Sequence, residues 1–308
     1  MKKLIYSFWV SIIILSLIGC GKEDAKQAAA NTVVNSGKIT KRARAGENRV
    51  YEQFSNVELF PDIQKIITRG TLNIGIYQDC DVPFVIKDSD GKVTGGLDME
   101  ITGFLADHLG VKPVYDYTIK SRVELFRKLH NGEIDIAAGE LSHTFDRGKY
   151  VYFSNTYAQL HPSLIMNKKD VVELGIRNDP YKYLSEKPCK IGVQADSSYI
   201  EYAQNLFPKA EVYEYPTLED ALDALNRNEV IALLHDDNEI VLLARQHAEI
   251  ALTNTVYVLK NKKDNICIAI SPKSPNLCDT VNLYLESDDL LFDVNDLIER
   301  YPDAYKCE

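Results

Sequence analysis

The chain has 308 residues and a formal net charge of −10 at pH 7, with 45% hydrophobic and 26% charged residues. This acidic balance argues against nucleic-acid binding, because attraction to phosphate needs a basic surface. Beyond its N-terminal region the sequence has no further long apolar stretch, so we expect a globular body, and its length of about 250 residues favours two lobes over one core.

The N-terminus resembles a bacterial lipoprotein signal. A short basic start at Met1-Lys-Lys3 precedes the apolar residues 4–18, and Leu17-Ile-Gly-Cys20 is similar to a lipoprotein cleavage motif. The apolar run is shorter than the roughly 20 residues that span a membrane, which favours a signal peptide over an uncleaved anchor helix. We therefore expect a signal peptide at 1–19, with Cys20 lipidated and the protein held at the bacterial cell envelope, facing the periplasm or the cell exterior.

The segment that follows Cys20 is expected to be a lipidated flexible tether over residues 20–56. It is rich in Ala, Lys, Asn and Gly and shows no apolar periodicity. Such a segment cannot bury enough surface to offset the entropy lost on ordering.

Strands and helices are predicted to alternate along the body, which favours α/β lobes with mainly parallel sheets. Leu72–Ile76 is a predicted strand. Apolar residues at every fourth position predict a helix over Leu97–Leu109, which Gly110 would close. A shorter helix over Val123–His130 and a buried strand over Ile134–Ala138 follow.

A second strand–helix series is predicted to begin at Lys190–Gln194. The apolar spacing over Leu218–Leu225 predicts an amphipathic helix, and Val230–Leu234 is the buried strand after it. The chain is expected to return through a strand at Ile266–Ile270 and to finish with two helices.

Cysteine usage leaves the redox chemistry open. Beyond Cys20 the sequence contains an odd number of cysteines in a chain expected to work outside the cytoplasm, where disulfides persist. They are Cys80, Cys189, Cys267, Cys278 and Cys307. One or two disulfides are expected among Cys80, Cys267, Cys278 and Cys307, and the sequence does not say which of these four cysteines pair. No Cys/His group has zinc-ligand spacing, so we expect no metal.

Several segments resemble, in order and spacing, the solute-binding proteins of polar amino acid ABC transporters, the bacterial extracellular solute-binding family 3. They are residues 63–76, 91–112, 129–138, 146–154, 228–236 and 268–273. The resemblance implies a two-lobed, type II periplasmic-binding-protein fold that closes on its ligand about a two-strand hinge. It places lobe 1 at 57–158 plus 266–308 and lobe 2 at 163–262, with crossings near 159–163 and 262–265.

A candidate carboxylate pocket follows the predicted strand at 134–138. A strand that ends in small hydroxyl residues, with an arginine five positions beyond Ser142, suits a carboxylate, because a guanidinium offers it a planar fork of donors. By resemblance, Arg147 is the carboxylate clamp and Ser142 a hydroxyl contact beside it. Glu140 lies where family members offer a backbone carbonyl to an amino group.

In lobe 2 the resemblance assigns the loop Gln194-Ala-Asp-Ser197-Ser198 to the same carboxylate, with a helix over Tyr199–Phe207 pointing its positive end at the anion. Asp236 is expected to hold the ammonium group of the ligand. The alternatives for Asp236 are an exposed turn or an ion pair with Arg245. A buried zwitterion requires both charges to be paired.

Two positions depart from the family pattern. Family members sandwich the ligand side chain between aromatic residues, and here those positions are Asp81 and Arg122. Either the two pair with each other, or they bind a polar or charged end of the ligand, with Tyr77 near enough in sequence to supply an aromatic face. Asp196 replaces a usual glycine and brings a negative charge near the carboxylate pocket unless its side chain points outward.

These features predict a lipid-anchored, monomeric substrate-binding protein, without cofactor or enzymatic activity, that captures a small zwitterion, expected to be a polar amino acid, for an ABC transporter permease. The segments at 96–100 and 104–112 also resemble the binding module of membrane-bound lytic transglycosylases, which keeps a cell-wall-fragment ligand open. A third alternative is an enzyme resembling the cyclohexadienyl dehydratases, with Glu140 or His143 as the acid.

Overall fold

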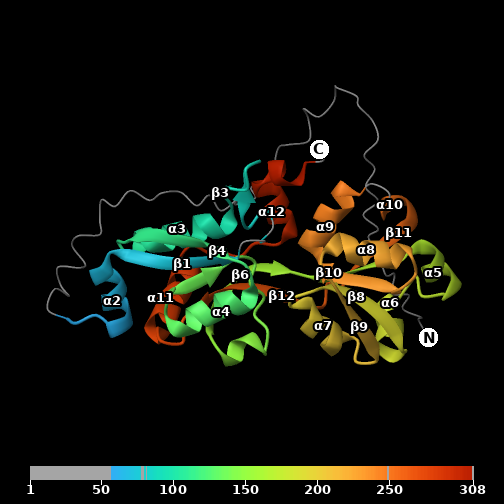
Figure 1. The fold of residues 1–308 in the computed structure, drawn as a ribbon, viewed down its shortest axis with the longest axis horizontal. Coiled ribbons are helices and arrows are strands. Elements are labelled where there is room, and N and C mark those ends of the chain that lie inside the picture. Colours follow the sequence, from blue (N-terminus) through green and yellow to red (C-terminus); the bar gives the residue numbers. More distant parts are fainter. Residues whose placement is uncertain (1–56, 78–79, 81, 248–249, 307–308) are drawn as a thin grey trace, which may run out of the picture. The chain divides into compact units, whose positions relative to one another are not determined.

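The computed structural model describes residues 57–77, 80, 82–247 and 250–306, which include two five-stranded sheets and the helices beside them (Figure 1). The expected signal peptide and tether, the lipidation residue Cys20 and the candidate ligand residue Asp81 lie outside the described residues. Within the described part, no helix combines the length and apolar character needed to cross a bilayer.

The first sheet has the strand order β4-β1-β5-β12-β6. Strand β1 runs parallel to β4 and β5, whereas β12 runs antiparallel to both β5 and β6. Every strand except β12 therefore points the same way, as the α/β pattern predicts. The strands are β1 (Thr71–Tyr77), β4 (Lys112–Ile119), β5 (Ile136–Ala138), β6 (Tyr152–Leu160) and β12 (Asp264–Ile270).

The helices beside this sheet begin and end at recognisable signals. Ser121 caps α4 by accepting a hydrogen bond from Glu124 N at 3.1 Å, and Gly132 ends the same helix in the left-handed conformation, at φ +74°. The elements are α2 (Pro61–Arg69), α3 (Leu97–His108), α4 (Arg122–Asn131), α11 (Pro275–Ser287), α12 (Val294–Arg300), the 3-10 turns η1 (Arg147–Lys149) and η2 (Pro302–Tyr305), and the hairpin strands β2 (Ile86–Lys87) and β3 (Val93–Gly95). We call this sheet and these elements the first lobe.

The second sheet repeats the plan with the order β11-β7-β10-β8-β9. Strand β8 is parallel to β9 and β10, and only β7 runs against its neighbours. Its strands are β7 (Pro162–Asn167), β8 (Cys189–Gln194), β9 (Ala210–Tyr215), β10 (Ala232–Asp236) and β11 (Asn254–Val258), and its helices are α5 (Lys168–Glu173), α6 (Pro180–Glu186), α7 (Tyr199–Leu206), α8 (Leu218–Asn226), α9 (Asp237–Gln246) and α10 (Ile250–Thr253). We call this set the second lobe.

The chain passes between the two sheets twice, and the two passages meet. It leaves the first sheet at Leu160 and enters the second at Pro162, then returns between Val258 and Asp264. Asp264 pairs with Leu160 in the register of β12 and β6. The outgoing and returning segments therefore lie side by side.

The expected disulfides do not form among the described residues. No disulfide joins any two of Cys80, Cys189, Cys267 and Cys278, and Cys307 lies outside the described part. The sulfur of Cys267 lies 3.8 Å from Thr156 Oγ1, and that of Cys278 lies 3.5 Å from Phe153 O. Burial raises the pKa of Cys267 to about 12, so this thiol stays protonated at neutral pH.

Candidate ligand-binding site

The loop after β5 carries three of the predicted ligand residues in an unusual backbone conformation. Gly139 has a φ of +123° and Glu140 one of +50°, a region that glycine adopts easily and glutamate does not. The buried carboxylate of Asp98, at the start of α3, supports this loop. It accepts the backbone N–H of Glu140 at 3.1 Å and the hydroxyl of Tyr157. Asp98 therefore fixes the direction of the strained Glu140 residue.

Asp98 was not among the residues expected from the sequence, and its environment is unusual for an acid. It is 1% exposed, and burial raises the pKa of its carboxyl to about 6 even though the hydrogen bonds from Tyr157, Glu140 and Gly139 lower it. Desolvation is therefore the larger effect. Asp98 is therefore a buried acid that supports the loop at Glu140 through its hydrogen bonds.

Arg147, the predicted carboxylate clamp, lies in η1 with its guanidinium turned back to the loop. Its Nη1 donates to Ser142 O at 3.1 Å, and the guanidinium carbon lies 5.6 Å from the centre of the Phe126 ring. Burial, and next the positive charge of Arg122, lower the pKa of Arg147 to about 10. A guanidinium has five N–H donors, so this one retains donors for an anion at neutral pH, when it is still charged.

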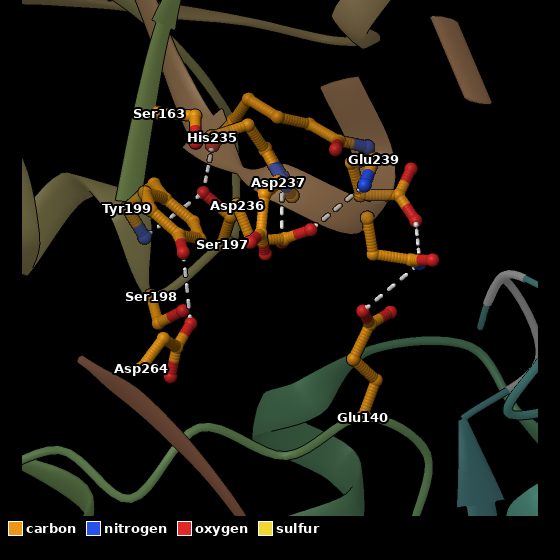
Figure 2. A network of polar contacts seen from close by, with 12 residues as sticks. Glu140, Ser163, Ser197, Ser198, Tyr199, His235, Asp236, Asp237, Glu239 and Asp264 are labelled. Carbon is orange, nitrogen blue, oxygen red and sulfur yellow. Dashed lines mark hydrogen bonds and ion pairs between the residues drawn. The ribbon is translucent and has the colours of Figure 1, made fainter. Parts of the chain in front are cut away.

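The hydroxyl of Ser142 meets the second lobe directly. Ser142 Oγ and Ser198 Oγ are 2.8 Å apart, although 56 residues separate them in sequence. Ser142 also donates to Asp264 Oδ2 at 3.0 Å, and this same oxygen accepts the Tyr199 hydroxyl at 2.9 Å. Figure 2 shows Asp264 beside Ser198 and Tyr199. The predicted hydroxyl contacts of both lobes thus converge, and they do so around an acid that the sequence did not point to.

The loop Gln194–Ser198 is held by its own bonds and by Arg122. Ser197 Oγ donates to Gln194 O at 2.6 Å and accepts Tyr199 N at 3.2 Å, so its hydroxyl orders the loop itself. Asp196 has a φ of +57°, in the left-handed region. Its carbonyl accepts a hydrogen bond from Arg122 Nη1 at 3.3 Å.

Arg122 belongs to α4 of the first lobe, so its bond to Asp196 joins the lobes. Its guanidinium carbon lies 4.6 Å from the centre of the Tyr77 ring, within the range of a cation–π contact. The aromatic face expected at Tyr77 is therefore covered by Arg122. The alternative pairing of Arg122 with Asp81 falls outside the described residues.

Carboxylates gather at the other end of the site. Asp236 ends β10 and caps α9 by accepting Glu239 N at 2.8 Å, and its second oxygen lies 2.8 Å from His235 Nδ1. It is 3% exposed. The suggested partner Arg245 instead lies 5.4 Å from the centre of the Tyr305 ring. Asp236 is thus a buried strand-end acid, neither exposed nor paired with Arg245.

Glu140 and Glu239 complete this acidic end. One oxygen from each of Glu140, Asp236 and Glu239 lies within 4.8 Å of the others. Asn238 Nδ2 lies 3.5 Å from Glu140 Oε1 of the first lobe and 3.3 Å from Glu239 Oε1 of the second. Carboxylate oxygens at this spacing suit an ammonium group or a hard metal cation. The sequence analysis did not identify Glu239, because this residue belongs to no recognisable motif.

A sequence profile described as bacterial extracellular solute-binding proteins, family 3, matches residues 72–289. The glutamine-binding protein of Geobacillus stearothermophilus is 23% identical over 291 residues, which cover 90% of this chain and 97% of that protein.

Solved structures share the fold, that of type II periplasmic binding proteins. The ABC transporter substrate-binding protein AbpA from Streptococcus pneumoniae, bound to L-arginine, aligns with a TM-score of 0.60 at 21% identity and covers 80% of this chain and 99% of its own. The ancestral amino acid-binding protein AncCDT-1, a precursor of cyclohexadienyl dehydratase, aligns with a TM-score of 0.58 at 23% identity over 79% of this chain and 99% of its own.

Proposed function

Because the chain belongs to family 3 of the bacterial extracellular solute-binding proteins, we propose that it captures a polar amino acid between its lobes and delivers it to an ABC transporter permease. One observation carries this proposal. Two poles of opposite charge lie where the lobes meet. Arg147 donates to Ser142 O beside the Ser142–Ser198 contact, and the carboxylates of Glu140, Asp236 and Glu239 gather within 4.8 Å of one another, the first from one lobe and the other two from the other.

The physical requirement for holding a zwitterion fits these poles. A carboxylate or an ammonium removed from water costs several kcal/mol unless an opposite charge or hydrogen bonds replace the water. Arg147 supplies the first partner with two serine hydroxyls beside it. The acidic end supplies the second, and one carboxylate of the three comes from the first lobe. A ligand bound at both poles therefore joins the lobes, and the two adjacent passages at 160–162 and 258–264 would act as the hinge.

The ligand class follows from the chemistry and from the relatives. The relatives named above bind glutamine and L-arginine, both of which are α-amino acids with polar side chains. Arg122 and Asp81 would lie near the side chain of such a ligand, so polar amino acids are favoured over apolar ones. Capture at the cell envelope would use the lipid on Cys20.

A thermal-unfolding screen of the purified protein tests the proposal. The probes are the twenty standard amino acids, dipeptides, murein fragments and prephenate. A ligand at 100 times its dissociation constant should stabilise the fold by about 2.7 kcal/mol. Stabilisation by one class of amino acid supports the proposal. A response to murein fragments or prephenate alone would replace it with the cell-wall or dehydratase alternative, and silence from every probe would contradict solute capture.

A further inference from the structure

Asp264 lies at the junction of the two passages between the lobes. Asp264 is the first residue of β12, and it pairs with Leu160 of β6. Leu160 lies two residues before Pro162, where the second sheet begins. Asp264 is 1% exposed. If one lobe rotates relative to the other about these passages, the pivot therefore lies close to this buried carboxylate.

Asp264 accepts hydrogen bonds from both lobes. From the first lobe, Ser142 donates to Oδ2 at 3.0 Å. From α7 of the second lobe, Tyr199 donates to Oδ2 at 2.9 Å and Tyr202 to Oδ1 at 3.1 Å. The acid is thus surrounded by hydroxyl donors, with no basic side chain bonded to it among the described residues.

The single proton of each hydroxyl gives this network a direction. Because the Ser142 proton is engaged by Asp264, Ser198 must be the donor in the 2.8 Å contact between the serines. While Asp264 is ionised, both serine protons therefore point along the chain of bonds toward Asp264. Neither is available to a ligand carboxylate.

The surroundings make Asp264 the group that can change this direction near neutral pH. The titratable groups that face it are Tyr199 and Tyr202 on α7, Asp236 on β10, Arg147 on η1 and Cys267 on β12. Burial, and next the charge of Asp236, raise the pKa of Asp264 to about 6, against the lowering effect of the three hydroxyl bonds. Burial also raises the pKa values of both tyrosines and of Cys267, so those groups stay protonated.

We propose that Asp264 is a positioning residue that takes up one proton from solvent when a ligand carboxylate binds beside Ser198. This inference rests on the proposed capture of an amino acid. Protonated Asp264 donates its O–H to Ser142 Oγ, Ser142 then donates to Ser198 Oγ, and Ser198 presents its proton to the ligand. The contacts between heavy atoms are unchanged, only the hydroxyl protons turn, and one negative charge is removed from the neighbourhood of the ligand carboxylate.

The test is calorimetric titration of the full protein at about pH 5.5 and about pH 7.5. The probes are L-glutamine, L-arginine and the amino acid that stabilises the fold most in the thermal screen. Each titration is run in two buffers with different heats of ionisation, which measures the protons taken up per ligand. The wild-type protein should bind about tenfold more tightly at the lower pH, because each pH unit between the free and bound pKa values changes the affinity tenfold. It should take up close to one proton per ligand at about pH 7.5 and a much smaller fraction at about pH 5.5, where Asp264, with a pKa of about 6, is already largely protonated before the ligand binds.

Asp264→Asn separates this role from a merely structural one. The asparagine amide donates to Ser142 as the protonated acid would, so we expect this variant to bind at about pH 7.5 as tightly as the wild type does at about pH 5.5, with no proton uptake. Asp264→Ala, which cannot orient the serines, should bind weakly at both pH values. The control is Asp279→Asn, an exposed position on α11, which should keep the wild-type pH profile.

The titrations distinguish failure of solute capture from failure of the role proposed for Asp264. If no probe binds the wild type at either pH, solute capture fails and this inference fails with it. If a probe binds without proton uptake at about pH 7.5, or if Asp264→Asn keeps the wild-type pH profile, capture stands and the role of Asp264 is overturned. The wild-type buffer comparison decides the question even if neither Asp264 variant folds.

Discussion

Tyr305, in the last turn of the first lobe, donates a hydrogen bond to Asn238 Oδ1 on α9 of the second lobe. Tyr305 is 1% exposed, and the side chains of Val241 and Leu242 from α9 pack against the same core. The C-terminal turn of the first lobe therefore contacts α9 and helps to fix its position. Asp236 caps this same helix. Asn238 in turn donates to Val82 O at 3.2 Å, on the first-lobe side.

Replacing Tyr305 with phenylalanine should lower stability while keeping the packing of the ring. The buried oxygen of Asn238 would lose its hydroxyl donor, which costs about 1–3 kcal/mol. We expect a thermal midpoint several degrees lower, measured by circular dichroism. The control is Tyr150→Phe, since Tyr150 is 62% exposed and its substitution should leave the midpoint unchanged. Equal midpoints for the wild type and Tyr305→Phe would show that this bond contributes nothing.

Asp98 should make stability depend on pH. The folded pKa of about 6 lies above the ordinary value of 3.8, so the folded state binds more protons than the unfolded state between these values. This group's contribution is therefore fully present below about pH 4 and is lost as the pH rises through about 6. On the scale of 1.36 kcal/mol per pKa unit, the change is on the order of 3 kcal/mol.

Asp98→Asn removes that titration. Chemical denaturation at several pH values should show the wild type gaining stability relative to the variant as the pH falls from about 6 to about 4. Asp279→Asn, on the surface of α11, should show no such divergence. Parallel stability curves for the wild type and Asp98→Asn would mean that the folded pKa of Asp98 is not raised.

Arg147→Ala should abolish ligand-induced stabilisation while the ligand-free protein still folds. Loss of the cation leaves a desolvated ligand carboxylate without its partner, which costs roughly 3–5 kcal/mol of binding. Arg127→Ala is the matched control, because Arg127 lies on the exposed face of α4 with a side chain 53% exposed in an ion pair with Glu133. Wild-type ligand affinity in Arg147→Ala would remove Arg147 from the carboxylate site.

Arg122→Gln should change which amino acids bind. Its guanidinium covers Tyr77 and reaches Asp196 O, so its removal exposes the tyrosine face and deletes a positive charge near the expected ligand side chain. We expect the ligand-free stability to change by no more than about 1 kcal/mol, since the lost bond is partly exposed. The measurement is the ranking of the twenty amino acids in the thermal screen. An identical ranking for wild type and variant would show that Arg122 does not contact the ligand side chain.

The periodicity of the sequence predicted most of the fold. The helices over 97–108 and 122–131 and the strands over 71–77 and 189–194 lie within one or two residues of the ranges expected, because apolar spacing and caps are local properties. The carboxyl ends of β5, β8 and β10 carry the loops with Ser142, Ser198 and Asp236. Because β8 and β10 are parallel neighbours in one sheet, their carboxyl ends share an edge, so the closeness of Ser198 and Asp236 follows from the pattern. Ser142 follows β5 in the other sheet, and its contact with Ser198 depends on how the two lobes meet.

The supporting acids could not be predicted in this way. Asp98 reaches Glu140 across 42 positions of sequence, and Asp264 reaches Ser142 across 122. Neither acid belongs to a local pattern, because its partner is set by how the sheet is assembled. The expectation of a disulfide was wrong for Cys80, Cys267 and Cys278 among themselves for a related reason, since counting cysteines gives no information on their distances in space.

Cys20→Ala tests the expected lipid anchor, the feature that would hold the protein at the cell envelope. Cys20 lies outside the described residues. If the segment ending at Cys20 is a lipoprotein signal, the thiol of Cys20 receives the diacylglyceryl group, and an alanine cannot accept it. A lipid chain contributes about 0.8 kcal/mol of membrane affinity per buried CH₂, so its loss should move the protein from the membrane fraction to the soluble fraction. Metabolic labelling with a fatty acid, followed by fractionation, measures both effects.

Continued labelling of Cys20→Ala would show that the lipid is attached elsewhere. Continued membrane association without labelling would show that an uncleaved apolar segment at 4–18 is the anchor. A Cys80→Ala control should keep both the label and the membrane association, because Cys80 is a buried thiol within the first lobe.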